Sequence, residues 1–412
     1  MKTTYQEPKE SRCPVCNTAK PTAVIEIRDI PVFCNMLRES RRAALEADRG
    51  NIRLCFCHTC GHLYNAAFDR GRMRYDPRYE TSLHYSPTFR RYALSLAKRL
   101  IRTYDLHKKD ILEIGCGQGD FLRLLADLGN NRCTGFDPSY DQQKIAQDHR
   151  LENLTVIQDY YSEQYSNYPA DFLVCRQVLE HIRQPRRFLE MIRRITDGSK
   201  NALIFVEVPN AMYTLGEFGI WDLIYEHYSY FTSLSLNYLF CETGFNPLNL
   251  SESFGGQYLC IEANTLVREQ KMDSRALDLT IEAVGNRVND FAENYRHTVL
   301  KWANKLAQMR QSGIKPVVWG AGSKGITFLN VLNTQETIDY VVDINPRKQG
   351  LHVPGTGQRV ISVDRMAEIQ PDVVIVMNPL YLDEIRQMIA EQGLHLPVLD
   401  VSDPELAGKA PI

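Results

Sequence analysis

A short apolar strand that runs directly into a glycine-rich loop limits the possible folds of this chain more than any other feature. The predicted strand is DILEIG, and the loop continues through Cys-Gly-Gln-Gly-Asp to Phe121. Gly115, Gly117 and Gly119 let the backbone turn sharply and pass close beneath a ligand. A strand, a glycine loop and a helix in this order open a βαβ unit, which builds a parallel sheet. We therefore expect an α/β fold.

Further apolar segments extend this sheet. The helix RRYALSLAKRLIRTYDL should precede DILEIG, and strands are expected at CTGFD, LTVIQ, FLVC and ALIFVEV. Because helical stretches lie between most of them, the pattern predicts a parallel sheet covered by helices over about residues 90–260. A long helix should follow within 270–312, where apolar residues recur at near-helical spacing. A second, small α/β unit begins at Lys315 and has its own glycine loop, Gly320 to Gly325.

Cysteines crowd the N-terminal segment. Six of the eleven fall from Cys13 to Cys60, which in a reducing compartment favours a metal site over disulfides. Two C-x-x-C pairs suit two turns that present four thiolates to one tetrahedral Zn²⁺, and an all-cysteine ligand set leaves no position for substrate. The predicted ligands of this structural zinc are Cys13, Cys16, Cys57 and Cys60. Three nearby side chains leave a different fourth ligand open: Cys55, His58 and His62.

Composition argues against several classes of partner. The formal net charge is −2 and the pI is about 6.6, so no global basic field exists and we expect no nucleic-acid partner. No apolar run reaches the ~18 residues that a membrane span requires, and the N-terminus lacks the apolar core of a signal peptide. We therefore expect a cytoplasmic protein with no membrane partner, present as a monomer or homodimer.

The first glycine loop has a spacing that favours one kind of ligand. Its G-x-G-x-G pattern lacks the last glycine of the dinucleotide fingerprint G-x-G-x-x-G. Asp137 ends the next strand, where a carboxylate can accept hydrogen bonds from both ribose hydroxyls. The segment from Glu113 to Phe121 resembles motif I of class I S-adenosylmethionine methyltransferases, whose cofactor carries a sulfonium and no phosphate. By that resemblance Asp137 would bind the ribose and Asp159 the adenine.

A dinucleotide loop or a merely structural turn is the alternative interpretation of this loop. The expected cofactor contacts are Glu113, Gly115, Gly117, Gly119, Asp137, Asp159 and Arg176.

Two histidines follow predicted strands. His181 lies in Cys175–Ile182, directly after the fourth strand, where an open α/β sheet has its ligand crevice. His227 lies beside Glu226 among phenols in WDLIYEHYSYF, a mixture that can supply a base, its electrostatic support and oxyanion donors. The alternatives are a buried structural histidine at position 181 and an aromatic packing cluster around position 227.

Together these motifs resemble the deoxysugar C-methyltransferases. The match comprises the two C-x-x-C pairs, Tyr79 ahead of SLHYSP, then EIGCGQG, LEH, YEHYSYFT, GAGSKG and VDINPRKQG, in order over nearly all of the chain. The resemblance implies methylation at C3 of a nucleotide-linked 4-keto-6-deoxysugar. It also implies a zinc-binding domain over 1–72, a methyltransferase domain over 73–265, a long connecting helix over 266–312 and a C-terminal Rossmann-like substrate-binding domain over 313–412.

One stretch departs from the family pattern. Members that act on thymidine-linked sugars carry His-Gly-Gly-Ser with an arginine soon after, whereas this chain has Phe254-Gly-Gly-Gln257. The glycines remain and the polar groups differ. The departure leaves the sugar configuration and the attached nucleotide open, without affecting the expected methyl transfer.

The expected chemistry assigns a role to each site residue. Making a carbon nucleophile requires removal of a proton α to the ketone, and imidazole has a suitable pKa for this. We assign His227 as the base, with Glu226 positioning or polarising it, although His181 and His227 could exchange roles. Donors to the developing enolate oxygen are expected to be His181, Tyr79 and Tyr225.

The second glycine loop is expected to hold the substrate's diphosphate. Ser323 and Lys324 would contact it, because amides at a helix N-terminus and one ammonium suit that anion. A loop without a ligand is the alternative at this position. For the whole chain, the alternative functions are an O- or N-methyltransferase and a dinucleotide-binding oxidoreductase that uses GAGSKG.

Overall fold

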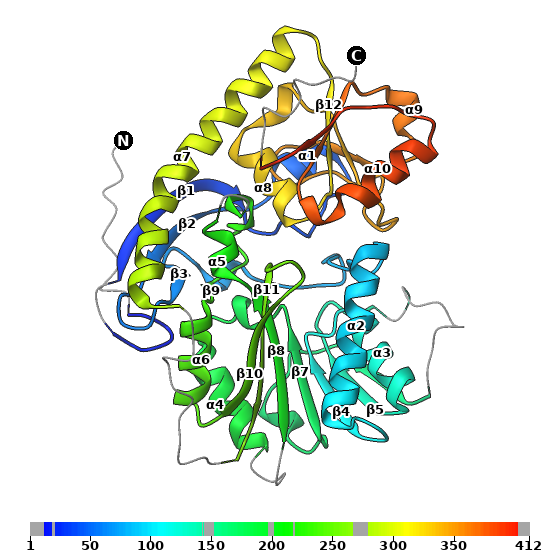
Figure 1. Cartoon of the computed structure of the whole chain (residues 1–412). Coiled ribbons are helices and arrows are strands. Elements are labelled where there is room, and N and C mark those ends of the chain that lie inside the picture. The colour runs from blue at the N-terminus through cyan, green and yellow to red at the C-terminus, as the bar shows by residue number, and fades with distance from the viewer. Residues whose placement is uncertain are drawn as a thin grey trace.

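The computed structural model describes residues 12–18, 21–141, 143, 152–196, 202–216, 219–266 and 279–402. Within these ranges the strands form sheets of seven, five and four strands. Figure 1 shows the seven-stranded sheet in the lower half of the molecule, the C-terminal sheet at the top, and α7 running along one side of the upper half. The α/β class predicted from the sequence is confirmed.

The seven-stranded sheet contains the first glycine loop. Its order is β10-β11-β8-β7-β4-β5-β6. The strands are β4 (Asp110–Ile114), β5 (Arg132–Phe136), β6 (Leu154–Ile157), β7 (Phe172–Arg176), β8 (Leu203–Pro209), β10 (Asn246–Ser253) and β11 (Tyr258–Asn264). β4 to β8 run parallel to one another, and every strand expected from the sequence in this region is present.

One edge of this sheet corrects the expectation of a parallel sheet. β11 pairs antiparallel with β8, and β10 pairs antiparallel with β11. The two strands are joined by a tight turn in which Phe254, Gly255 and Gly256 have positive φ. A hairpin of this kind joins antiparallel neighbours without a helical crossover, so the βαβ alternation stops at β8.

Helices pack against the faces of this sheet. They are α2 (Pro87–Tyr104), α3 (Asp120–Gly129), α4 (Pro185–Thr196), α5 (Ala211–Thr214) and α6 (Ser233–Glu242). The expected helix before β4 is α2. It begins at Pro87, whose missing N–H costs nothing at a first helical position, and the Ser86 hydroxyl accepts a hydrogen bond from the Phe89 amide. Its buried stripe packs on α3 in a common apolar cluster.

The four-stranded sheet joins the N-terminal segment to the centre of the chain. Its order is β1-β2-β3-β9, and its elements are β1 (Thr22–Pro31), β2 (Arg49–Phe56), β3 (Leu63–Asn65) and β9 (Ser229–Tyr230), with α1 (Arg41–Leu45) between β1 and β2. Because β9 begins two residues after His227, pairing of β3 with β9 fixes that histidine against the N-terminal segment.

The C-terminal sheet is parallel throughout, in the order β14-β13-β12-β15-β16. Its strands are β12 (Pro316–Trp319), β13 (Tyr340–Val342), β14 (Arg359–Ile361), β15 (Val373–Val376) and β16 (Val398–Asp400), and its helices are α8 (Ser323–Val331), α9 (Met366–Ile369) and α10 (Leu382–Glu391). The strand order reverses beside β12. That reversal places the second glycine loop where doubly wound sheets bind ligands.

The expected long helix is α7 (Ile281–Gln311), while residues 267–278 of the predicted stretch lie outside the described residues. The buried Trp302 of α7 donates a hydrogen bond to the Val401 carbonyl at 2.8 Å. Buried residues of β1, β2, α7 and the C-terminal sheet belong to one apolar cluster. The N-terminal and C-terminal parts of the chain therefore share a core.

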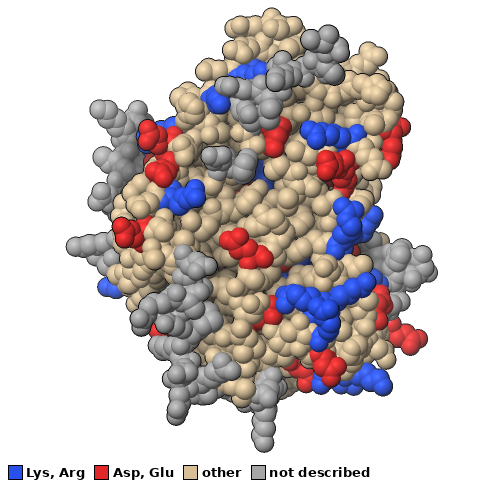
Figure 2. Space-filling model, in the orientation of Figure 1, with Lys and Arg blue, Asp and Glu red and all other residues tan. Residues whose placement is uncertain are grey.

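The visible surface mixes charges of both signs. Figure 2 shows acidic and basic side chains interspersed on this face, with uncharged surface between them and a group of basic side chains over α2. Among the described helices, none combines the length and the apolarity needed to cross a bilayer.

Candidate active site

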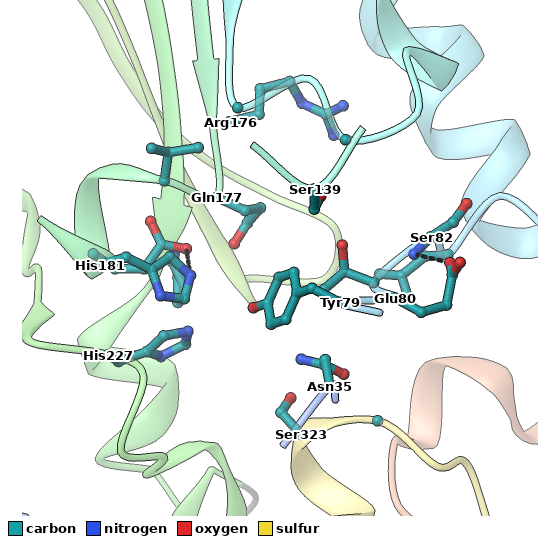
Figure 3. A pocket seen from close by; sticks show the side chains of 18 of the residues that line it. Asn35, Tyr79, Glu80, Ser82, Ser139, Arg176, Gln177, His181, His227 and Ser323 are labelled. Carbon is teal, nitrogen blue, oxygen red and sulfur yellow. Dashed lines mark hydrogen bonds and ion pairs between the residues drawn. The ribbon is translucent and has the colours of Figure 1, made fainter. Parts of the chain in front are cut away.

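A cavity of about 1220 Å³ lies where the three sheets meet. Its walls come from both glycine loops, from the segment 79–86 ahead of α2, and from the turns that carry the two histidines. Figure 3 shows the Tyr79 hydroxyl pointing toward His181 and His227, with Ser323 of the C-terminal unit on another wall. The cavity thus brings together motifs that lie more than 200 residues apart in the sequence.

The first glycine loop is open to this cavity. At Gly115, where φ is +71°, a Cβ would lie 2.1 Å from a methyl group of Val178, so the loop packs closely on the turn after β7. At Gly117, where φ is +58°, a Cβ would meet nothing within 4 Å. The Asp137 carboxylate accepts hydrogen bonds from the amides of Gly117 at 2.8 Å and Ser139 at 2.7 Å. These hydrogen bonds fix the backbone of the loop in a shape that can hold a ligand.

Two carboxylates at this loop fit a ligand of the predicted kind. Glu113 is 2% exposed, and its Oε2 has no hydrogen-bond partner among the described residues. Burial raises the pKa of Glu113 to about 8. Asp159 accepts a hydrogen bond from the Tyr165 hydroxyl at 2.5 Å, which lowers the pKa of Asp159. An unpartnered carboxylate beside an open cradle suits S-adenosylmethionine, because that molecule carries both an ammonium and a sulfonium.

Most predicted cofactor contacts line the cavity. The lining includes Glu113, Gly115, Gly117, Asp137, Asp159 and Arg176. Gly119 does not line it and instead caps α3, with φ at +83°. Arg176 donates to Glu207 Oε1 at 2.9 Å and lies over the Phe121 ring at 4.1 Å from its centroid. The Arg176 charge is therefore already paired with a buried carboxylate.

The two histidines lie together. Their ring centroids are 4.9 Å apart. His181 Nδ1 lies 3.0 Å from the Glu226 backbone carbonyl, which can only accept, so Nδ1 carries the proton and Nε2 keeps a lone pair. His227 makes no side-chain hydrogen bond to the described residues. Burial lowers the pKa of His181 to about 4, and burial together with His181 lowers the pKa of His227 well below 6.5. Both rings are therefore neutral at pH 7.

The Glu226 side chain does not contact His227 as we expected, and its backbone carbonyl contributes to the site instead. Its Oε2 accepts a hydrogen bond from the Cys34 amide at 3.3 Å, and no hydrogen bond joins its carboxylate to His227 among the described contacts. Burial raises the pKa of Glu226 to about 7, against a smaller opposite effect of the neighbouring Tyr79 hydroxyl. Its backbone carbonyl instead orients His181.

The structure does not bring Tyr225 to the cavity. Its ring stacks on Phe68, and its hydroxyl accepts a hydrogen bond from the Asp69 amide at 2.9 Å. Tyr75, which no motif indicated, lies beside His181 instead, with its hydroxyl 3.1 Å from Nδ1. Burial raises the pKa values of Tyr75 and Tyr79 well above 10, so both phenols keep their protons.

The second glycine loop faces the same cavity, but its charged side chain is already paired within the protein. Ser323 lines the wall at the start of α8. Lys324 also lines it, but its Nζ lies 3.3 Å from Asp222 Oδ2 and donates to Gln257 Oε1 at 3.1 Å. The Lys324 ammonium is therefore paired within the protein.

Further residues of the cavity were not predicted. Glu80 follows Tyr79 and accepts hydrogen bonds from Asn345 Nδ2 at 3.2 Å and Arg347 Nη1 at 3.3 Å. The Ser82 hydroxyl donates to Asp120 at the start of α3 at 2.8 Å. The segment that carries Tyr79 is thus held by both α/β units. Such contacts join residues with no shared motif, so local patterns could not reveal them.

The four predicted zinc ligands form one cluster. Their sulfur atoms all lie within 4.8 Å of one another. Cys13 Sγ lies 3.7 Å from Cys60 Sγ, and Cys16 Sγ lies 3.5 Å from Cys57 Sγ, close to the ~3.8 Å separation of sulfurs around tetrahedral zinc. His58 and His62 turn elsewhere, toward Thr22 and Ser235 respectively. The donor set fits a structural zinc ion.

Comparisons with known proteins agree with this arrangement. Residues 87–250 match the methyltransferase domain family, and residues 265–395 match the C-methyltransferase C-terminal domain family. The C-methyltransferase NovU of Streptomyces niveus is 24% identical over 290 residues, which cover 67% of each chain.

Shorter similarities extend over the methyltransferase region. The ubiquinone biosynthesis O-methyltransferase of Yersinia pestis (strain Pestoides F) is 29% identical over 106 residues, which span 24% of this chain and only 43% of that protein. A crystal structure of an S-adenosylmethionine-dependent methyltransferase from Aquifex aeolicus covers 47% of this chain and 100% of its own, at 16% identity and a TM-score of 0.35.

The central sheet, its glycine loop and the first domain match define an S-adenosylmethionine-dependent methyltransferase. The second domain match and the Streptomyces relative make the chain an S-adenosylmethionine-dependent C-methyltransferase. The matches favour methyl transfer over the alternative of a dinucleotide-binding oxidoreductase, since GAGSKG falls inside the C-methyltransferase C-terminal domain match.

Proposed function

We propose that this enzyme methylates the carbon α to the ketone, C3, of a nucleotide-linked 4-keto-6-deoxysugar through an enolate. The observation that supports this most is the pair of neutral, partly buried histidines beside Tyr79 in a cavity lined by both glycine loops. A neutral imidazole can take the α-proton, which methyl transfer to oxygen or nitrogen would not require.

His227 acts as the base in this proposal. Its ring lines the cavity and has no hydrogen-bond partner among the described residues, so its nitrogen atoms are available to substrate. His181 Nδ1 is held by the Glu226 carbonyl, which leaves Nε2 as the atom that meets the ketone or the proton. Exchange of the two roles is the second form of the proposal.

Tyr79 donates a hydrogen bond to the developing enolate oxygen. Its hydroxyl points toward the histidines (Figure 3), and it stays protonated because burial and Glu226 raise its pKa. One well-placed donor of this kind is worth about 3 kcal/mol of transition-state stabilisation. S-adenosylmethionine supplies the methyl group to the enolate carbon and leaves as the neutral sulfide, S-adenosylhomocysteine.

The C-terminal unit holds the nucleotide part of the substrate. Ser323 and the amides at the start of α8 are offered to the diphosphate. Lys324 contributes only if substrate competes with Asp222 for its ammonium, which lies 3.3 Å from that carboxylate. A nucleotide sugar suits a cavity lined by both loops, because its sugar and its nucleotide are separate ends of one molecule.

A zinc ion bound by Cys13, Cys16, Cys57 and Cys60 has a structural role in this proposal. The sulfur spacing supports tetrahedral coordination. Three of these cysteines pack in one apolar cluster with Phe231 and Leu236 of the central unit. The zinc would therefore stabilise the wall that carries His227.

Solvent exchange tests the enolate. The enzyme is incubated in deuterium oxide with a nucleotide-linked 4-keto-6-deoxysugar and S-adenosylhomocysteine, so that no methyl transfer occurs. We expect deuterium to appear at C3 with the wild type and with His107→Ala, an exposed control, and not with His227→Ala. A wild-type enzyme that methylates the substrate when S-adenosylmethionine is supplied, yet causes no deuterium exchange at C3 in this experiment, would support methyl transfer to oxygen or nitrogen.

A further inference from the structure

Glu180 is a buried carboxyl group with no partner in the part of the chain that the structure describes, and burial raises its pKa well above 4.5. It lies in the short turn Leu179–His181 after β7 and is 1% exposed. Neither Oε1 nor Oε2 has a hydrogen-bond partner among the described residues. The neighbouring His181 is neutral, and its Nε2, which carries a lone pair, lies 3.9 Å from Oε1. A buried carboxylate without a donor or cation is costly, so a group from outside the protein is expected to meet it.

The position of Glu180 ties it to the methyl donor. Glu180 lines the cavity together with the first glycine loop. Its turn packs on that loop through Val178, whose methyl group would lie 2.1 Å from a Cβ at Gly115. The ligand atoms of Glu180, His181 and His227 lie within 4.8 Å of one another. Glu180 therefore lies close to the base, in a turn that packs against the donor's loop.

We propose that Glu180 is the electrostatic partner of the sulfonium of S-adenosylmethionine, and that it holds the reacting end of the donor beside the histidines. The inference rests on the donor, which the methyltransferase domain supports, and not on the identity of the acceptor. Failure of the proposed sugar substrate would leave it intact. Glu113, the other unpartnered carboxylate of the cavity, would then face the donor's ammonium.

A positive charge is available to pair with the Glu180 carboxylate at every stage of the reaction. Before reaction the sulfonium is positive and both histidines are neutral. When the base takes the α-proton, the imidazolium and the enolate form as a pair. When the C–C bond forms and the S–C bond breaks, the sulfur keeps the electron pair and becomes neutral, while the positive charge remains on the imidazolium. One positive charge thus stays within reach of one carboxylate throughout.

Paired titrations with charged and neutral ligands test this role. Dissociation constants are measured by calorimetry for S-adenosylmethionine and for S-adenosylhomocysteine, which differ in the charge on sulfur. With Glu180→Gln we expect affinity for S-adenosylmethionine to fall about 10- to 100-fold, as for loss of a desolvated ion pair, and affinity for S-adenosylhomocysteine to stay within about twofold. Sinefungin, which carries an amine in place of the sulfonium, should follow S-adenosylmethionine.

Glu113→Gln is the matched control, since the same change is made at another buried, unpartnered carboxylate. It should weaken both ligands by similar factors, because both carry the ammonium. If Glu180→Gln weakens both ligands equally, or neither, the sulfonium role is wrong. Co²⁺ can also be added to the wild-type protein after its zinc site is filled. A visible Co²⁺ absorption band that is lost in Glu180→Gln would assign Glu180, His181 and His227 to a metal site and overturn the sulfonium role.

Discussion

The two glycine loops share a backbone design and differ in their charges. In each, an aspartate after the next strand accepts a loop amide at 2.8 Å, Asp137 from Gly117 and Asp343 from Ala321. Around the first loop, Glu113 Oε2 and both carboxyl oxygens of Glu180 have no hydrogen-bond partner among the residues that the structure describes. Beside the second, Lys348 donates to the Ala321 carbonyl at 2.9 Å, and Lys324 is paired with Asp222.

This difference separates the two loops by what they can do. Burial raises the pKa values of the Glu113 and Glu180 carboxyl groups, and a cationic ligand beside them would favour their charged form, so the first loop suits a cationic donor. At the second loop the Lys324 charge is paired within the protein and Lys348 is held by a neutral carbonyl, so the loop suits binding of an anion without chemistry. A glycine motif alone therefore does not indicate its ligand. The charged groups around the loop do.

The largest expected effect concerns the central site. His227→Ala should lower kcat about 10²- to 10⁴-fold, because the base is lost, while the affinity for S-adenosylmethionine stays within about twofold. Steady-state kinetics and calorimetry measure the two quantities. If the variant keeps more than about a tenth of the wild-type rate, His227 is not the base, and His181→Ala becomes the decisive variant.

Zinc should support the central unit more than the C-terminal one. Cys57→Ser is expected to lower the free energy of unfolding by about 4 kcal/mol, as for loss of a structural metal, because Cys57 packs with Phe231 and Leu236. Hydrogen exchange should locate the loss in β7, β8 and α6. Cys241→Ser, outside the cluster, is the control. Equal stability after complete chelation would refute the structural zinc.

Alanine substitutions in the loops should separate donor from acceptor binding. Gly117→Ala forces a positive φ on alanine, which costs about 1–2 kcal/mol, so the dissociation constant of S-adenosylmethionine should rise about tenfold. Gly322 has φ of −103° and open space at its Cβ position. Gly322→Ala should leave donor binding unchanged and raise only the KM for the nucleotide sugar. A donor effect from Gly322→Ala would contradict the division.

The smallest expected effect is on acid stability. The pKa of His181 is about 4 in the folded protein and about 6.5 when unfolded, so the unfolded state binds the proton first as pH falls. Between pH 6.5 and 5 this should cost the wild type about 1.5 kcal/mol. Urea denaturation should show a loss about 1.5 kcal/mol smaller in His181→Asn than in the wild type, because His227 keeps its own contribution in both proteins. Parallel curves for the two proteins would mean that His181 is not buried and neutral.

Local patterns in the sequence predicted a large part of the molecule. The strands from β4 to β8, α2 and the set of four cysteines depend on apolar runs, caps and short spacings, and all are present. The hairpin of β10 and β11 was missed because its Phe-Gly-Gly turn interrupts the βαβ alternation. Pairing of β9 with β3 joins residues about 165 positions apart, which no local signal reports.

The site was predicted less completely than the fold. His181, His227 and Tyr79 come together as expected. Tyr225 and Tyr75 could not be told apart by type, because only tertiary packing decides which phenol reaches His181 and which stacks on Phe68. Pairing of Lys324 with Asp222 also depends on contact between the two α/β units.

The position of the transferred methyl group tests the central claim most directly. The enzyme is supplied with S-adenosylmethionine labelled with ¹³C at the methyl carbon and with a nucleotide-linked 4-keto-6-deoxysugar, and the product is examined by NMR. We expect the labelled methyl group to be bonded to C3, with the proton at C3 lost to solvent. A methyl group found on oxygen or nitrogen, or a substrate left unmethylated while a different ketone accepts the label, would contradict the proposed reaction.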